Sequence, residues 1–149
     1  MDQKKPDLNI FHEKFVQEIE ELQGGQINVV VSGAENSVET VDAHGHLADL
    51  VAKAPSLCIS QINGHSGCLV CLHPGERIQQ GRGNIRVYPY NSRDHPLRTH
   101  EQTLLHATRA ERTGKPVFGV KGVSPLLRVI KVPDNVLLDY SILSLQESF

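Results

Sequence analysis

The segment from residue 49 to residue 75 constrains this chain most, because it ends in two cysteines separated by two residues. Cys68 and Cys71 are two of three cysteines in a chain of 149 residues. Such a count does not suit a disulfide framework, and in a reducing compartment a C-x-x-C pair more often binds metal or does redox chemistry. The segment begins with an isolated carboxylate, Asp49, and contains a polar turn at 61–64. This order predicts an acidic position joined to a loop that a metal ion stabilises.

The spacing of Cys68 and Cys71 lets both sulfurs approach one Zn²⁺ at about 2.3 Å, because the two intervening residues form a tight turn. The pair supplies half of a tetrahedral site. The other ligands can come from outside this chain or from nearby side chains, namely His73, His100, His65 and Cys58. We take His73 and His100 as the expected partners. Two alternatives remain: reduced structural thiols, and a redox pair, although residues 72–75 do not resemble the helix start that redox pairs use.

The length predicts a single domain, 1–149, large enough to bury roughly 70% of its unfolded surface. Hydrophobic residues make up 39% and charged residues 21%, which is typical of a globular chain and not of a disordered one. No apolar run reaches the roughly 18 residues of a membrane span, and the start lacks the apolar core of a signal peptide. We therefore expect an intracellular protein, nuclear or cytoplasmic, without membrane contact.

Charge is divided unequally along the chain. Residues 1–75 carry four lysines and ten acids, a net charge of −6, whereas residues 76–131 carry eleven lysines and arginines and four acids, a net charge of +7. This asymmetry predicts a polyanion as partner of the second half, although a basic surface can also be solvated or meet an acidic protein.

Five arginines lie close together in a segment that we call the basic arm: Arg77, Arg82, Arg86, Arg93 and Arg98. Guanidinium groups bind phosphate oxygens in bidentate pairs, so this segment suits the DNA backbone. Because no helix that would read bases is evident, binding would be mainly electrostatic and sensitive to salt. We call the loop around Cys68 and Cys71 the knuckle. The knuckle and the basic arm together occupy residues 58–98.

The first half of the chain predicts a helix followed by two extended segments. Asn9 can cap a helix to about Gln23, with a solvated acidic face and an inner face of Phe11, Phe15, Ile19 and Leu22. Residues 27–31 and 37–47 indicate strands. Pro55 belongs in a first turn, so the next helix is expected to begin near Ala54 and run to about residue 60. Asp49 would then lie between a strand and a helix, where open α/β sheets place their chemistry.

The second half predicts an exposed loop at 75–83, a strand at 85–88 and a helix from Thr99 to about Thr113. Thr99 and Gln102 have the form of a capping box, and Gly114 ends the helix. Its expected inner face consists of Leu104, Leu105, Ala107 and Ala110. Glycines and prolines at 115–127 indicate irregular structure, and the pattern at 132–145 does not decide between helix and strand.

Two further patterns could bind metal. His44 and His46 share one face of an extended segment, as at the start of a barrel amidohydrolase metal site, but such barrels need about 200 residues or more. Two surface histidines are the better interpretation. Phosphodiester chemistry with two Mg²⁺ ions needs several convergent carboxylates, and Asp139 is the one plausible later partner for Asp49.

The order of several short motifs resembles the CACTA-like DDE transposases, a transposon-derived family with an RNase H-like fold. Asp49-Leu-Val-Ala-Lys53-Ala resembles the D-x-x-A-[RK] motif that carries the second catalytic acid. Gln61-Ile-Asn-Gly64, followed by Gly67-Cys68-Leu-Val-Cys71-Leu-His73-Pro-Gly75, resembles the family's knuckle. Matching segments continue in family order: Lys5 to Asn9 before these motifs, then Arg86 to Pro89, Arg98-Thr99, Gly119 to Ser124, and Val132 to Tyr140.

The resemblance implies an α/β, partial RNase H-like domain with a zinc-knuckle insertion. The family's first and last catalytic acids have no counterpart here, so Asp49 is expected to be a catalytic remnant that bound Mg²⁺ in an intact ancestor. The expected function is that of a catalytically inactive transposase-derived fragment with a structural Zn²⁺ at Cys68 and Cys71 and DNA-backbone binding. The alternatives are a zinc-stabilised protein-interaction module and an active Mg²⁺-dependent nuclease. No small-molecule substrate is expected.

Overall fold

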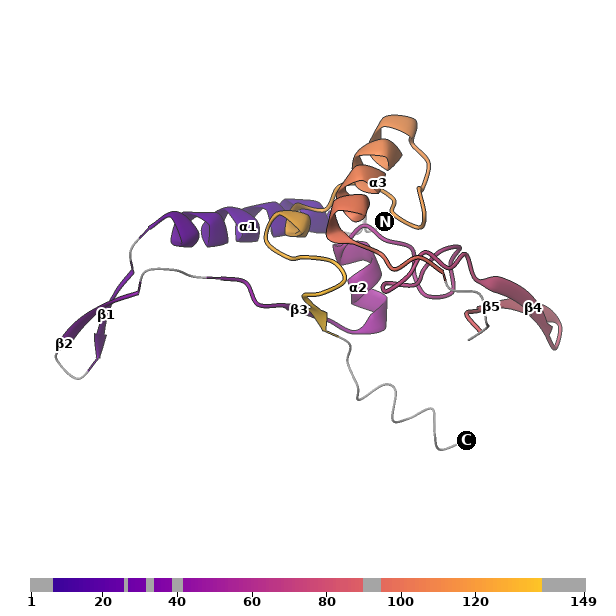
Figure 1. Cartoon of the computed structure of the whole chain (residues 1–149), viewed down its shortest axis with the longest axis horizontal. Helices are drawn as coiled ribbons and strands as arrows, with labels where there is room; N and C mark the ends of the chain where they lie inside the picture. The colour runs from indigo at the N-terminus through magenta and orange to yellow at the C-terminus, as the bar shows by residue number, and fades with distance from the viewer. Residues whose placement is uncertain (1–6, 26, 32–33, 39–41, 90–94, 138–149) are drawn as a thin grey trace, which may run out of the picture.

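The computed structural model of the chain describes residues 7–25, 27–31, 34–38, 42–89 and 95–137. Within these residues it is a small mixed α/β arrangement of helices and three two-stranded sheets (Figure 1). The described strands do not join into one central sheet, because each pairs with a single neighbour. The α/β prediction is therefore confirmed at the level of class. No helix in the described part of the chain combines the length and the apolar character that a bilayer crossing requires.

Helix α1, Leu8–Gly24, begins two residues earlier than predicted, because its cap is Asp7 and not Asn9. Asp7 is the N-cap, and its carboxylate accepts a hydrogen bond from the Asn9 N–H at 3.0 Å. The expected inner face is wrong, because Phe11 is 69% and Phe15 47% exposed, whereas Val16 is fully buried. Among the described elements α1 packs against α2 and η1. The buried side of α1 is therefore the side that carries Val16, which is next to the predicted face.

Strands β1, Ile27–Val31, and β2, Ala34–Val38, form an antiparallel hairpin with Val31 opposite Ala34. The first strand is confirmed. The second begins three residues before its predicted start, because Ala34 already pairs with Val31. The remainder of that predicted segment contains residues 39–41, outside the described part, and β3, His46–Leu47, which pairs in parallel with β6, Val136–Leu137. Residues 138–145 also lie outside the described part.

Helix α2, Leu50–Ser56, begins earlier and ends earlier than predicted. Asp49 caps it, and its carboxylate accepts a hydrogen bond from the Ala52 N–H at 2.6 Å. A cap of this kind starts a helix irrespective of a proline one turn later. Pro55 then lies inside the helix, where it lacks an N–H and crowds the carbonyl four residues earlier. This explains why the helix ends directly afterwards.

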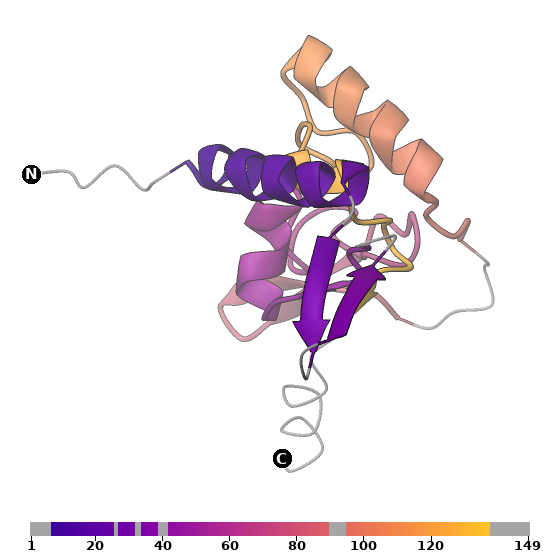
Figure 2. The ribbon, with the colours of Figure 1, turned by 90° about the vertical axis from the view of Figure 1, so that its left-hand side faces the viewer.

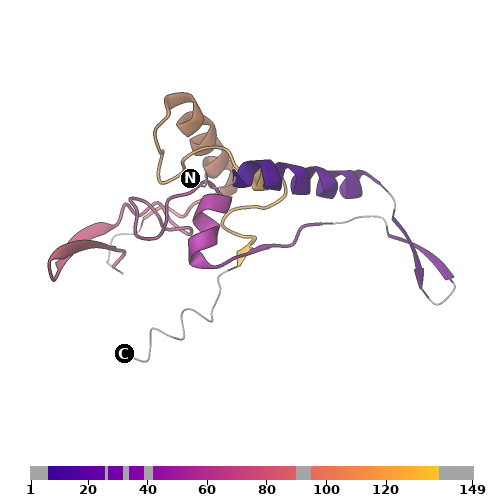
Figure 3. The same cartoon turned by 180° about the vertical axis from the view of Figure 1, so that it is seen from behind.

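Residues 76–87 form a projecting hairpin (Figure 1), so the loop predicted at 75–83 is wrong, whereas the strand predicted at 85–88 is confirmed with shifted bounds. Strand β4, Glu76–Gln80, pairs antiparallel with β5, Gly83–Val87, and Gly81 at the turn has a φ of 58°. This left-handed conformation favours glycine, and it lets two residues connect the strands. Hairpin β4–β5 and hairpin β1–β2 lie at opposite ends of the molecule, as Figure 3 also shows from behind.

Helix α3, His100–Thr113, has the predicted bounds. The Thr99 hydroxyl accepts a hydrogen bond from the Gln102 N–H, and Gly114 follows in the left-handed conformation at φ 65°. The inner face consists of Thr103, Ala107 and Ala110, while Leu104 and Leu105 are exposed, contrary to the prediction. Small side chains at this spacing let the helix approach its neighbours closely. Figure 2 shows α3 rising beyond α1.

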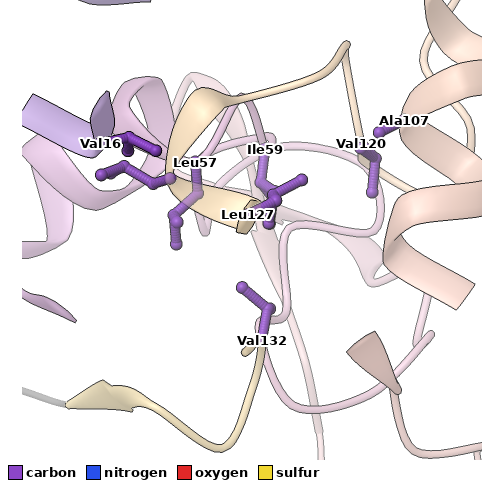
Figure 4. Close-up of a cluster of buried hydrophobic side chains, with 8 residues drawn as sticks. Val16, Leu57, Ile59, Ala107, Val120, Leu127 and Val132 are labelled. Atoms are coloured by element: carbon purple, nitrogen blue, oxygen red, sulfur yellow. The ribbon is translucent and has the colours of Figure 1, made fainter. Parts of the chain in front are cut away.

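A compact core joins segments that are far apart in the sequence (Figure 4). The buried apolar cluster consists of Val16, Leu57, Ile59, Ala107, Val120, Leu126, Leu127 and Val132. The 3₁₀ helix η1, Pro125–Arg128, supplies two of these residues and confirms that the 115–127 region is irregular. The core therefore lies where α1, α3, η1 and the segment after α2 meet.

Candidate functional site

Asp49 is exposed and serves as the cap of α2. The described residues contain no group of three or more His, Cys, Asp or Glu side chains that could hold a metal ion, so no carboxylate cluster surrounds Asp49 there. Asp139, its expected partner, lies outside the described residues. The geometry shown for Asp49 is that of a structural cap.

The two knuckle cysteines lie together, with Sγ atoms 3.3 Å apart. The Cys71 N–H donates to Cys68 Sγ at 3.4 Å, and the His73 N–H faces the Cys71 sulfur. Hydrogen bonds of this kind stabilise a thiolate relative to a thiol. Burial nevertheless raises the pKa of Cys71, and the His73 N–H and the Arg98 charge oppose that rise. The loop thus presents two sulfurs to one point while protecting them from water.

A short ladder holds the knuckle against the segment that precedes α3. Cys71 pairs with Leu97 in an isolated antiparallel bridge. The Leu72 N–H donates to the Pro96 carbonyl at 2.9 Å, and the Arg98 N–H donates to the Val70 carbonyl at 2.8 Å. The orientation of the sulfurs is therefore set by backbone pairing that the sequence pattern did not predict.

The cysteine pair fits two positions of a tetrahedral Zn²⁺ site, in which sulfurs at about 2.3 Å from the metal lie just under 4 Å apart. The predicted histidine ligands are differently engaged. His73 Nδ1 accepts the Gly75 N–H at 2.8 Å, so in the neutral ring the proton lies on Nε2, which is buried without a partner among the described residues. His100 Nδ1 accepts the Val132 N–H at 3.3 Å. Within the described residues the structure does not bring a third ligand to the cysteines.

The remaining histidines have separate roles. The rings of His73 and His95 are in contact, with centroids 3.9 Å apart and planes tilted by 49°, and His65 contacts the hydroxyl of Ser66. His46 Nε2 lies 2.9 Å from Ser56 Oγ, whose hydroxyl donates to the Lys53 carbonyl. His44 is exposed. His44 and His46 therefore differ in burial, and no metal group of the described residues includes them.

Arg98, expected on the DNA-facing arm, lies in the interior at 2% exposure. Its Nη2 donates to three backbone carbonyls, at 3.0 Å to Phe118, 3.1 Å to Cys68 and 3.4 Å to Ser66. Burial lowers the pKa of the guanidinium, and the nearby cysteines oppose that effect. A buried arginine that gathers three loop carbonyls holds the fold together and cannot lie against a phosphate backbone.

The other described arginines of the basic arm lie on hairpin β4–β5. Arg77 and Arg86 are direct cross-strand partners and therefore share one face, and Arg82 lies at the exposed turn. Like charges directly opposite each other repel, which favours an anion beside them. Arg86 is partly satisfied, because its Nη1 donates to the carbonyls of Pro74 and Gly75. Arg93 lies outside the described residues.

The sequence predicted that the acidic face of α1 is solvated, but two of its glutamates form ion pairs. Arg128 of η1 forms ion pairs with Glu13 at 2.8 Å and with Glu20 at 2.9 Å. These two carboxylates raise the pKa of the Arg128 guanidinium. Part of the charge asymmetry between the two halves is therefore neutralised inside the chain, and hairpin β4–β5 retains the basic character.

Two residues that the sequence analysis includes only as members of motifs have roles in the fold. Tyr88 connects the arm to the turn at 61–64, because its hydroxyl accepts the Gly67 N–H at 2.7 Å and donates to the Gly64 carbonyl. Lys53 is 1% exposed, and its Nζ has no hydrogen-bond partner among the described residues. For Tyr88, the one signal in the sequence was a tyrosine at the end of a predicted strand. For Lys53 there was no signal, because the pattern of apolar and polar residues along a helix does not reveal that a lysine is buried.

Comparison with known protein families, with curated proteins and with solved structures finds no match to this chain.

Proposed function

We propose that this chain is a DNA-binding domain derived from a CACTA-like DDE transposase, with a partial RNase H-like fold. Hairpin β4–β5 contacts the phosphate backbone, and a Zn²⁺ ion at Cys68 and Cys71 stabilises the knuckle at its base. The motif order in the sequence supports the family assignment. Asp49 retains the place of a catalytic acid and acts as a helix cap, so binding and not cleavage is the activity of this domain.

The observation that carries the proposal is the projecting hairpin with Arg77, Arg82 and Arg86. Two-stranded ribbons are narrow enough to enter the major groove of DNA. The arm is stiffened at its base, where Arg86 and Tyr88 bond to the knuckle and to the turn at 61–64. A rigid arm loses little entropy when it binds, which makes its few arginines effective.

Binding to duplex DNA across a salt series tests this function. We expect the affinity of the wild type to fall steeply with salt, and the double variant Arg77→Gln/Arg82→Gln to reduce the slope of log affinity against log salt by about 2. The measurement is fluorescence anisotropy with a labelled duplex. The matched control, Arg109→Gln/Arg112→Gln, removes two exposed arginines from α3 and should leave the slope unchanged. Absence of salt-dependent affinity in the wild type would refute the proposal.

A second candidate function is a zinc-stabilised protein-interaction module. It is favoured by the apolar side chains that the described residues leave uncovered, with Ile10 74% and Phe11 69% exposed on α1 and Leu105 67% exposed on α3. This alternative predicts no salt-dependent DNA affinity, so the same salt series separates the two.

A further inference from the structure

A cleft of about 720 Å³ lies beside α2, away from hairpin β4–β5 and from the cysteine pair. This volume is within the range of small-ligand sites, roughly 300 to 1,000 Å³. Apolar side chains form much of its wall, including Val51, Pro55 and Ile59. Polar side chains come from four separate segments, and those that bear on its chemistry are Asn9, Cys58, Gln61, Asn63, Glu111 and Lys121.

Several motifs that the sequence analysis singled out meet at this cleft. The turn at 61–64 supplies Gln61 and Asn63, and the segment 119–124 supplies Lys121. Asn9, at the end of the first such motif, completes the wall together with Ala54. The function proposed above uses none of these side chains, so their convergence requires a separate explanation.

Backbone pairing holds the cleft open in one geometry. Ile59 pairs with Val120 in an antiparallel bridge, the Ser60 N–H donates to the Gly119 carbonyl, and the Lys121 N–H donates to the Cys58 carbonyl, both at 2.7 Å. Cys58 itself has a φ of 52°, which is uncommon for a residue other than glycine and is found most often at functional sites. The backbone that carries the polar side chains is thus fixed by pairing between the two segments.

The polar groups match the hydrogen-bonding edge of a nucleobase. Carboxamides such as those of Gln61 and Asn63 each offer a donor and an acceptor, the pattern by which Asn and Gln pair with adenine, and a carboxylate such as that of Glu111 accepts from the cytosine amino group. Lys121 can meet the attached phosphate. The aliphatic wall offers flat apolar contact to the face of a base. A peptide backbone would also use carboxamides, but it has no need of both a lysine and a carboxylate in the lining.

The cleft is mechanically connected to the arm. Tyr88 follows β5, and its hydroxyl bonds to the Gly64 carbonyl and the Gly67 N–H, directly after the turn residues Gln61 and Asn63. This contact links the wall of the cleft to the base of the hairpin that is proposed to bind DNA. We infer that this cleft binds an unpaired nucleobase of DNA, an inference that deepens, and so rests on, the DNA binding proposed above.

Alkylation of Cys58 in the intact chain tests the cleft directly. The rate at which iodoacetamide modifies Cys58 is measured by peptide mass spectrometry in the presence of each of the four deoxynucleoside monophosphates and of a short single-stranded oligonucleotide. We expect at least one mononucleotide to slow the modification severalfold. In Gln61→Ala/Asn63→Ala, the mononucleotide concentration that gives half of the full protection of Cys58 should rise about tenfold or more, since two base-edge contacts are removed. Gln17→Ala, an exposed glutamine on α1, is the matched control and should behave as the wild type.

Binding of a mononucleotide in the cleft does not involve hairpin β4–β5, so the alkylation rate tests the cleft even if no duplex binding is found. Duplex binding that persists while neither mononucleotides nor the oligonucleotide slow Cys58 modification would overturn the cleft inference and leave the arm intact. Equal protection in the wild type and in Gln61→Ala/Asn63→Ala would also overturn it. Protection by unstructured peptides, with none by nucleotides, would assign the cleft to a protein ligand instead.

Discussion

Arg98 illustrates how one side chain can organise loops that have no regular structure. Its Nη2 lies within 3.4 Å of carbonyl oxygens from residues 66, 68 and 118, so it joins the knuckle to the segment after α3. Backbone carbonyls buried in loops need donors, and a guanidinium can supply several at once. An exposed arginine on a DNA-binding arm and a buried arginine that holds loops are indistinguishable in the sequence.

Replacement of Arg98 by lysine should lower the free energy of unfolding by about 2–4 kcal/mol, because an ammonium cannot reproduce the planar set of donors and stays charged in the interior. Urea unfolding measures the loss. Arg109→Lys, at an exposed position on α3, is the control and should change stability by less than about 0.5 kcal/mol. Equal effects of the two substitutions would contradict the buried role of Arg98.

Gly119 is required by both conformation and space. Its φ is 82°, and a Cβ atom built there would lie 2.1 Å from the Ser66 carbonyl oxygen. Gly119→Ala should therefore destabilise the chain by more than about 3 kcal/mol or prevent folding. Gly122→Ala is the matched variant, since a Cβ there meets nothing within 4 Å, and it should stay within about 1 kcal/mol of the wild type. Circular dichroism during urea unfolding compares the two, and a stable Gly119→Ala would count against this packing.

At the scale of elements, the knuckle and hairpin β4–β5 behave as one unit. The backbone ladder at Cys71 and Leu97 fixes one side, and the Arg86 contacts to Pro74 and Gly75 fix the other. Gly75 is needed at this junction, because its φ is 74° and a Cβ there would lie 2.7 Å from the Arg86 side chain. Loss of order in the knuckle is therefore expected to make hairpin β4–β5 less rigid.

Purified protein is expected to contain Zn²⁺, and Cys68→Ser should lose the metal and lower the melting temperature by more than about 5 °C, since metal binding contributes to folding. Elemental analysis and thermal unfolding measure the two effects. Cys58→Ser removes the cysteine in the cleft, away from the pair, and should retain the metal. A wild type that carries no metal, even after expression with added zinc, would remove zinc from the proposed function.

The helices show that a stripe of apolar residues does not by itself identify the buried face. On α1 the predicted stripe contains Phe11 and Phe15, whereas the contact with the other described elements is made around Val16. On α3 the leucines are exposed and two alanines are buried. Two adjacent stripes on one helix differ by about 100° of rotation, so the choice depends on the neighbours that pack against it.

For the whole molecule, the distribution of charge and of buried histidines determines how stability depends on pH. Burial lowers the pKa of His46, and the charges of His12 and Lys53 lower it further. Burial also lowers the pKa of His12 and of His106. Below the ordinary histidine value of 6.5, the unfolded chain therefore binds more protons than the folded chain, and the free energy of unfolding decreases as the pH falls.

We expect the free energy of unfolding to decline as the pH falls below about 6.5. Urea unfolding at a series of pH values measures this dependence. His46→Gln should flatten the decline, because it removes one group that gains a proton on unfolding, whereas His44→Gln, at an exposed position two residues earlier, should leave it unchanged. A stability that rises on acidification would show that these histidines are not buried.

Local signals in the sequence predicted the elements that depend on neighbours along the chain. The bounds of α1 and α3, the strand at 27–31, and the end of α3 at Gly114 follow from caps, periodicity and glycine. The proximity of Cys68 and Cys71 follows from their spacing. Residues 75–83 were predicted as a loop because glycines bound them, although the pairing of β4 with β5 depends on a turn conformation at Gly81 that composition does not reveal.

The sequence by itself determined helices α1 and α3, the close cysteine pair and the clustering of arginines in one segment, because each depends on residues only a few positions apart. The tertiary structure alone decided that Arg98 is interior while Arg77 and Arg82 are exposed, and that Gln61 and Lys121 share a cleft. These outcomes depend on contacts between segments separated by tens of residues. Such contacts form only when the distant segments pack together, so a pattern of neighbouring residues does not predict their free energy.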